Sequence, residues 1–125
     1  MHTEAAESYR LAQAIYLSLG YSRGEATVLE GLGGLYARLY LLAEAEECFA
    51  QARFLYAAIL DEKCEAKALD GLMAAQSLQN KFGDAERACM EACEIYKRIG
   101  QPMSAVCANT LGFLQDVQGI PFKPL

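Results

Sequence analysis

The chain has 125 residues, which is enough for one modest hydrophobic core and too few for two separate domains. Its net charge is −5 at pH 7 and its 11 basic residues are scattered, which argues against a nucleic-acid partner, because such proteins bind phosphates through clustered Lys and Arg. No apolar run reaches the roughly 18 residues that a membrane-spanning helix needs, and the acidic N-terminus does not resemble a signal peptide. We expect a soluble, cytoplasmic protein without a membrane partner.

The residue pattern predicts an all-α fold. No proline interrupts the stretch from Met1 to Gln101, which is rich in the strong helix formers Ala, Leu and Glu. Apolar residues recur at spacings of three and four, and the alternation typical of strands is absent. In chain order, we expect six helices, at 3–19, 22–39, 43–59, 62–80, 84–99 and 102–118, followed by a non-helical tail at 119–125.

Start and stop signals place the boundaries between these helices. Gly20 is expected to close the first helix, and Ser22 with Glu25 is expected to form a capping box at the start of the second. Further breaks are expected near Leu41, near Asp61, at Gly83 with Asp84, and from Gly100 to Pro102. At these breaks glycine would supply a left-handed cap and Pro102 a preset first helical residue.

The sequence repeats at a period of forty residues. Tyr16, Tyr56 and Tyr96 fall in one column, and the segment that begins at Gly24 aligns with the one that begins at Cys64. This register divides a single domain, 1–118, into a half repeat 3–20, repeats 21–60 and 61–100, and a half repeat 101–118. Each repeat is one helical hairpin that cannot bury its apolar face alone, so the hairpins should stack into a curved α-solenoid of antiparallel helices.

The repeated residues resemble the tetratricopeptide repeat (TPR). Its pattern of a large residue, Leu-Gly, Tyr, Ala and Phe is found in the first repeat at Leu29, Leu32, Gly33, Tyr36, Ala45, Phe49 and Ala52. The second repeat keeps Leu69, Leu72, Ala85 and Ala92. The forty-residue period is similar to the longer repeats of kinesin light chains and spindle-orientation adaptors. The resemblance implies a non-catalytic scaffold or adaptor that binds a peptide or helix of a partner protein on a concave surface.

The three tyrosines of the repeat column have a structural and a functional interpretation. Apolar columns at helical spacing usually belong to the core, so we expect Tyr16, Tyr56 and Tyr96 to pack against the next repeat with their hydroxyls near solvent. The rival interpretation is a functional aromatic stripe.

In proteins of this family the first helix of each hairpin lines the concave face, and carrying this over gives the candidate binding residues. They are Thr27, Glu30, Gly31, Gly34, Arg38, Lys67, Asp70, Gly71, Ala74, Ser77, Asn109, Thr110 and Phe113, and Val106 lies on the same face.

Two features of this face bear on the partner. The basic residues with which chaperone-docking members clasp a terminal carboxylate are missing, which disfavours an acidic C-terminal peptide. Glu30 and Asp70 would favour a basic partner. Gly31 and Gly71 would give room for a bulky side chain or a partner helix, or would allow tight packing within the solenoid.

Catalytic and metal chemistry find little support in the sequence. The only histidine is His2, so no histidine-based dyad or triad can form, and we expect no enzyme activity. The cysteines are expected to be reduced core residues. Cys89 and Cys93 lie one helical turn apart and could share an ion with Cys107, but a structural zinc site takes four ligands. We therefore expect no metal and no cofactor.

Two further alternatives remain open from the sequence. The chain could be a peptide-sensing regulatory TPR domain of a larger regulator. Its first and last helices are half hairpins that lack a polar cap, which predicts either a fragment of a longer array or a homodimer formed through the unpaired terminal helices.

Overall fold

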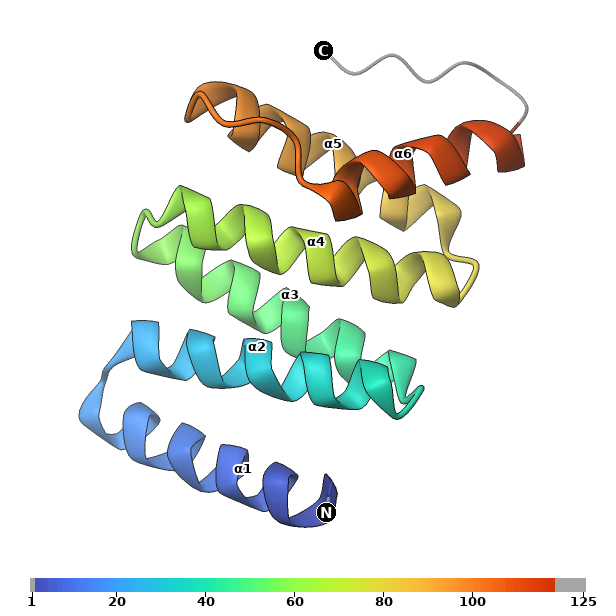
Figure 1. Cartoon of the computed structure of the whole chain (residues 1–125). Coiled ribbons are helices and arrows are strands. Elements are labelled where there is room, and N and C mark those ends of the chain that lie inside the picture. The colour runs from blue at the N-terminus through green and yellow to red at the C-terminus, as the bar shows by residue number, and fades with distance from the viewer. Residues whose placement is uncertain (1, 119–125) are drawn as a thin grey trace.

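The computed structural model describes residues 2–118, and within this range the chain forms α-helices and no strands (Figure 1). The helices are α1 (His2–Leu19), α2 (Ser22–Arg38), α3 (Leu42–Ala58), α4 (Glu62–Leu78), α5 (Phe82–Arg98) and α6 (Ala105–Gln118). The tail predicted at 119–125 lies outside the described residues. None of the helices in the described range is both long and apolar enough to cross a membrane.

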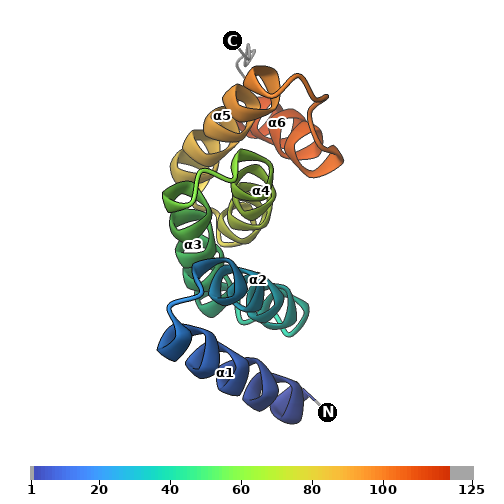
Figure 2. The same ribbon diagram turned by 90° about the vertical axis from the view of Figure 1, so that its left-hand side faces the viewer.

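Each helix packs against the next one in the chain, which confirms the predicted all-α helical-repeat fold. Contacts also join α2 to α4 and α4 to α6. Figure 2 shows α2, α4 and α6 on one side of the stack, and α3 and α5 on the other. The even-numbered helices therefore form one continuous surface, which is the surface that the sequence predicts as the binding face.

The turns share one backbone geometry. Five residues spaced by twenty adopt a left-handed conformation, namely Gly20, Tyr40, Leu60, Asn80 and Gly100. In each turn the following amide donates to a carbonyl five residues earlier, as from Leu41 to Tyr36 at 2.9 Å. This is the Schellman motif, which ends a helix by satisfying its last carbonyls. Each forty-residue period of the sequence therefore corresponds to two successive helix-turn units of the backbone, which are equal in length.

Two predicted boundaries are wrong in their details. Ser22 lies inside α2, and the cap residue is Tyr21, which makes no capping hydrogen bond through its side chain. The Tyr21 ring instead packs on Tyr16, with ring centroids 5.5 Å apart, as the apolar contact across a Schellman turn requires. Gly83 lies within α5, because Asn80 supplies the left-handed residue of that turn.

The last helix also starts later than predicted. Pro102 precedes α6, which begins at Ala105. Ser104 caps this helix, since its hydroxyl accepts a hydrogen bond from the Cys107 amide at 3.0 Å. A capping hydroxyl satisfies an amide that the first helical turn would otherwise leave free. The helix start is therefore set by Ser104 and not by the proline.

Alanine at repeated positions lets the helices approach closely. Three pairs of alanines forty residues apart are fully buried: Ala26 with Ala66, Ala45 with Ala85, and Ala52 with Ala92. Leu29 and its equivalent Leu69 fill the space beside them. Interiors are packed as densely as organic crystals, so the small and the large positions must alternate between facing helices. This core fixes α4 against α6 and so positions the candidate site.

Candidate functional site

A groove lies between α4 and α6 on the surface of even-numbered helices. Its volume is about 350 Å³. Its lining residues are Ala74, Ser77, Leu78, Val106, Asn109, Thr110 and Phe113. All of them except Leu78 belong to the face that the resemblance to the TPR family implies. Leu78 was missed, and its spacing of four from Ala74 is the sequence signal that would have found it.

The groove is apolar with a few polar groups. Phe113 is 44% exposed at its wall, and its ring is 5.6 Å from that of Phe82. Asn109 is exposed, so its amide is open to a ligand, and Ser77 Oγ is buried without a hydrogen-bond partner in the described part of the chain. Apolar walls with a small number of polar groups are typical of sites that accept one side chain and orient its backbone.

The two acidic residues predicted to attract a basic partner are bound within the solenoid. The Tyr56 hydroxyl donates to Glu30 Oε1 at 2.9 Å, and the Tyr96 hydroxyl donates to Asp70 Oδ2 at 2.7 Å. Tyr56 is 2% exposed and Tyr96 is 7% exposed, so the prediction that these hydroxyls lie near solvent is wrong. A buried phenol needs a hydrogen-bond acceptor and a buried carboxylate needs a donor. Where two helices cross, each group meets the requirement of the other.

Burial changes the acidity of both partners in the second pair. Burial raises the pKa of Asp70, against a smaller opposing effect of its hydrogen bond with Tyr96. Burial, and then the hydrogen bond to Asp70, raises the pKa of Tyr96 to about 12. Burial likewise raises the pKa of Tyr56 to about 12. The two pairs therefore join neighbouring helices of the solenoid.

The predicted glycines divide into two kinds. A Cβ atom at Gly31 would lie 2.6 Å from the Tyr9 ring, and one at Gly71 would lie 2.5 Å from the Phe49 ring. The room beside these two glycines is thus filled by rings of the solenoid itself, in agreement with the packing interpretation. A Cβ atom at Gly34 would meet no neighbouring atom within 4 Å, so this glycine borders open space.

The remaining predicted residues stand apart from the groove. Arg38 and Lys67 are exposed. Thr27 is bound locally, since its hydroxyl donates to the Arg23 carbonyl at 2.9 Å and lies 3.2 Å from the Tyr56 hydroxyl. The structure therefore brings Ala74, Ser77, Asn109, Thr110 and Phe113 together and leaves the other candidates dispersed.

A second groove, of about 340 Å³, lies between α2 and α3. Its lining residues are Glu25, Leu29, Glu47, Ala50, Gln51, Phe54 and Leu55. Phe54 is the most exposed of the chain's described phenylalanines, at 69%. This groove is not predicted from the sequence, because most of its lining belongs to α3, the second helix of a hairpin.

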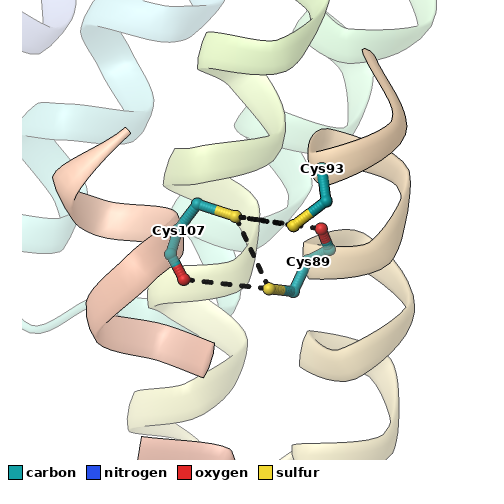
Figure 3. A group of neighbouring side chains, drawn as sticks. All are labelled: Cys89, Cys93 and Cys107. Atoms are coloured by element: carbon teal, nitrogen blue, oxygen red, sulfur yellow. Dashed lines mark hydrogen bonds between the residues drawn. The ribbon is translucent and has the colours of Figure 1, made fainter. Parts of the chain in front are cut away.

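Three cysteine thiols meet between α5 and α6 (Figure 3). The Cys107 Sγ atom lies 3.6 Å from that of Cys89 and 3.4 Å from that of Cys93, and all three sulfur atoms lie within 4.8 Å of one another. Cys89 and Cys107 are fully buried, whereas Cys93 is partly exposed. The three residues form no disulfide. We call them the thiol cluster.

No family model matches this chain, and comparison with curated proteins and with solved structures finds no significant match. The likeness to tetratricopeptide repeats therefore rests on the repeated residues alone.

Proposed function

We propose that the chain is a non-catalytic interaction module of the scaffold or adaptor kind, similar to tetratricopeptide-repeat proteins, which binds a segment of a partner protein in the α4–α6 groove. The observation that carries this proposal is the convergence of five predicted binding residues on that groove. The groove accepts one bulky apolar side chain against Phe113, while the Asn109 amide hydrogen-bonds the backbone of the bound segment. We also propose a reducing cytoplasmic setting, which the free cysteines support.

The partner segment should be recognised by shape and apolar contact more than by charge. Glu30 and Asp70 are taken up by tyrosine hydroxyls, so the local attraction for basic residues that the sequence predicts is weakened. The net charge of −5 still favours partners without strong negative charge, because long-range repulsion slows their association.

The test is a selection of binding peptides from a displayed random library, followed by calorimetry on the purified chain. We expect selected peptides to share one bulky apolar residue and to lose at least about tenfold in affinity with Phe113→Asp, about 1.4 kcal/mol. Phe54→Asp is the matched control, since it places the same charge in the other groove. Equal losses in the two variants, or a selection that yields no binder, would refute the proposal.

A second copy of the chain is a further proposed partner. Among the described helices, α1 packs against α2 only, and it leaves Leu11, Leu17 and Leu19 between 63% and 71% exposed. Exposed leucines that cluster on one helix are typical of a protein–protein contact. Light scattering should give a dimer that Leu11→Glu with Leu17→Glu dissociates, and a monomeric wild type would dismiss this partner.

A further inference from the structure

The thiol cluster has the ligand number of a three-coordinate ion. No fourth His, Cys, Asp or Glu of the described chain joins the three sulfur atoms. A structural zinc ion takes four ligands, and a site with three would leave it an open position for water. Two of the three cysteines are closed to solvent, because Cys89 and Cys107 are 0% exposed. The arrangement suits an ion whose coordination shell is complete with three thiolates.

The spacing of the sulfur atoms suits one central ion. Three sulfur ligands about 2.3 Å from an ion, at angles between roughly 95° and 120°, lie about 3.4 to 4.0 Å apart. The two shorter separations in the thiol cluster are 3.4 Å and 3.6 Å, and the third is under 4.8 Å. A disulfide would require one pair to close to about 2.05 Å. Binding an ion therefore demands less movement than oxidation does.

The net charge of the complex indicates which of the ions that thiolates bind would suit this site. Three thiolates around a monovalent or divalent ion leave a net negative charge, whereas around a trivalent ion they leave none. The cluster belongs to an apolar core that contains Ala88, Ala92 and Leu69. The charged groups that act on Cys89 are the carboxylates Asp70 and Glu86, both of which oppose further negative charge. An uncompensated buried charge is costly, so a neutral complex is favoured.

We propose that Cys89, Cys93 and Cys107 bind trivalent arsenic, taken up as arsenous acid, as a neutral three-thiolate complex that links α5 to α6. Three sulfur–arsenic bonds form and three arsenic–oxygen bonds break. Each hydroxyl of arsenous acid leaves as water with the proton of one thiol, so no proton is released and no electron is transferred. The inference is independent of the proposed partner binding in the α4–α6 groove.

The protonation of the thiols agrees with this chemistry. A hydrogen bond with Cys89, and then burial, raises the pKa of Cys107, and burial raises the pKa of Cys93. The hydrogen bond with Cys107 lowers the pKa of Cys89. Each of the three thiols gives its proton to one hydroxyl that leaves as water. Cys93 is the partly exposed member and gives the reagent its way in.

The test is a titration of the reduced wild-type chain with sodium arsenite, read by native mass spectrometry. We expect one arsenic atom per chain with the loss of three hydrogen atoms, the signature of three sulfur–arsenic bonds. The thermal midpoint should rise with arsenite concentration, because a ligand that binds only the folded state stabilises it. An adduct that retains a hydroxyl, or no adduct, would overturn the proposal.

Two variants locate the binding. Cys93→Ala should weaken binding by about a hundredfold, because the third attachment to a chelated ion is intramolecular and gains from its high effective concentration. The double variant Cys48→Ala with Cys64→Ala removes two cysteines outside the cluster and should bind as the wild type does. Equal binding by wild type and Cys93→Ala would contradict the site, and circular dichroism checks that each variant is folded.

Two further measurements test the charge argument. An indicator dye in weakly buffered solution should record no proton release when arsenite binds, and an equimolar zinc salt should not displace the bound arsenic. Release of protons, or displacement by zinc, would show that the site prefers a charged complex and would overturn the choice of a trivalent ion.

Discussion

The hairpins α2–α3 and α4–α5 share a backbone but fill their interiors differently. Phe49 of the first hairpin lies against Gly33 and Gly71, where a Cβ atom would approach its ring to 3.0 Å or less. In the second hairpin the equivalent of Phe49 is Cys89, and the equivalent of Gly33 is Met73, which is fully buried. The volume lost where a cysteine replaces the phenyl ring is regained on the facing helix, where a methionine replaces a glycine. The same repeated backbone can therefore hold different core side chains, provided that their total volume is similar.

This exchange explains where the thiol cluster comes from. A phenyl ring at position 89 would fill the space in which the Cys89 sulfur lies beside that of Cys107. Replacing the ring by a thiol brings sulfur atoms from two helices into contact, and Cys93 joins them from the next turn of α5. The second hairpin thus supplies two cysteines of the thiol cluster and the α4 side of the α4–α6 groove, whereas in the first hairpin the Phe49 ring fills the equivalent space.

The largest effects are expected where the two hairpins are alike. Leu29 and Leu69 are equivalent and each is 1% exposed. Leu29→Ala and Leu69→Ala should each lower the unfolding free energy by about 3 kcal/mol, because both remove a buried side chain and leave a cavity. Urea denaturation measures both, and a difference of more than about 1.5 kcal/mol would show that the equivalent sites are not packed alike.

The exchange of volume between positions 89 and 73 can be tested by restoring the ring. Cys89→Phe should cost about 2 kcal/mol, because overfilling a packed core forces side chains and backbone apart. Adding Met73→Gly should recover at least about 1 kcal/mol of this loss, since neighbouring substitutions that share one space are coupled. Strictly additive losses in the double variant would refute the volume exchange.

The tyrosine–carboxylate pairs should differ in strength between the hairpins. Tyr96→Phe is expected to cost about 2 kcal/mol, because it removes the hydroxyl that donates to the buried Asp70, and Tyr56→Phe about 1 kcal/mol, because Glu30 is less buried. The measurement is again urea denaturation at neutral pH. The reverse order would mean that Asp70 finds another donor.

High pH provides a second readout for the same pair. The pKa of Tyr96 is raised from 10.0 to about 12 in the folded state, so its contribution to stability is complete below pH 10 and is lost as the pH rises towards 12. Tyr96→Phe should remove this part of the alkaline loss and flatten the stability curve in that window. An unchanged slope would show that Tyr96 does not titrate with folding.

The smallest effect concerns the turns. Tyr40 and Leu60 adopt the left-handed conformation that glycine takes at Gly20 and Gly100. Leu60 is 86% exposed, so its side chain contributes little packing to offset the backbone strain. Leu60→Gly should raise the unfolding free energy by about 0.5–1 kcal/mol, because only glycine adopts this conformation without steric cost. A thermal midpoint that falls would contradict this account of the turns.

The sequence predicted the parts of the fold that depend on the repeat period. The break near Leu41 has no glycine or proline, yet the forty-residue register placed it correctly, because the backbone repeats even where the turn residues change. Local signals were less reliable. Ser22 and Glu25 match a capping box, but the ring contact between Tyr16 and Tyr21 sets that turn.

The position of the candidate site could be predicted from the sequence better than the interactions of its residues could. The resemblance to tetratricopeptide repeats implied that Ser77, Asn109 and Phe113 lie on one surface, and the three residues meet at the α4–α6 groove. The resemblance could not show that Asp70 is paired with Tyr96, since their contact joins residues 26 positions apart on different helices. Nor could spacing show that the sulfur atoms of α5 and α6 meet.

The most direct test of the binding account is an amide chemical-shift map of the isotope-labelled chain titrated with a selected peptide. The account predicts that the largest shifts occur at Ser77, Asn109 and Phe113 and that they saturate together. Shifts centred on Gln51 and Phe54 would place the binding site in the α2–α3 groove and contradict the assignment to the α4–α6 groove.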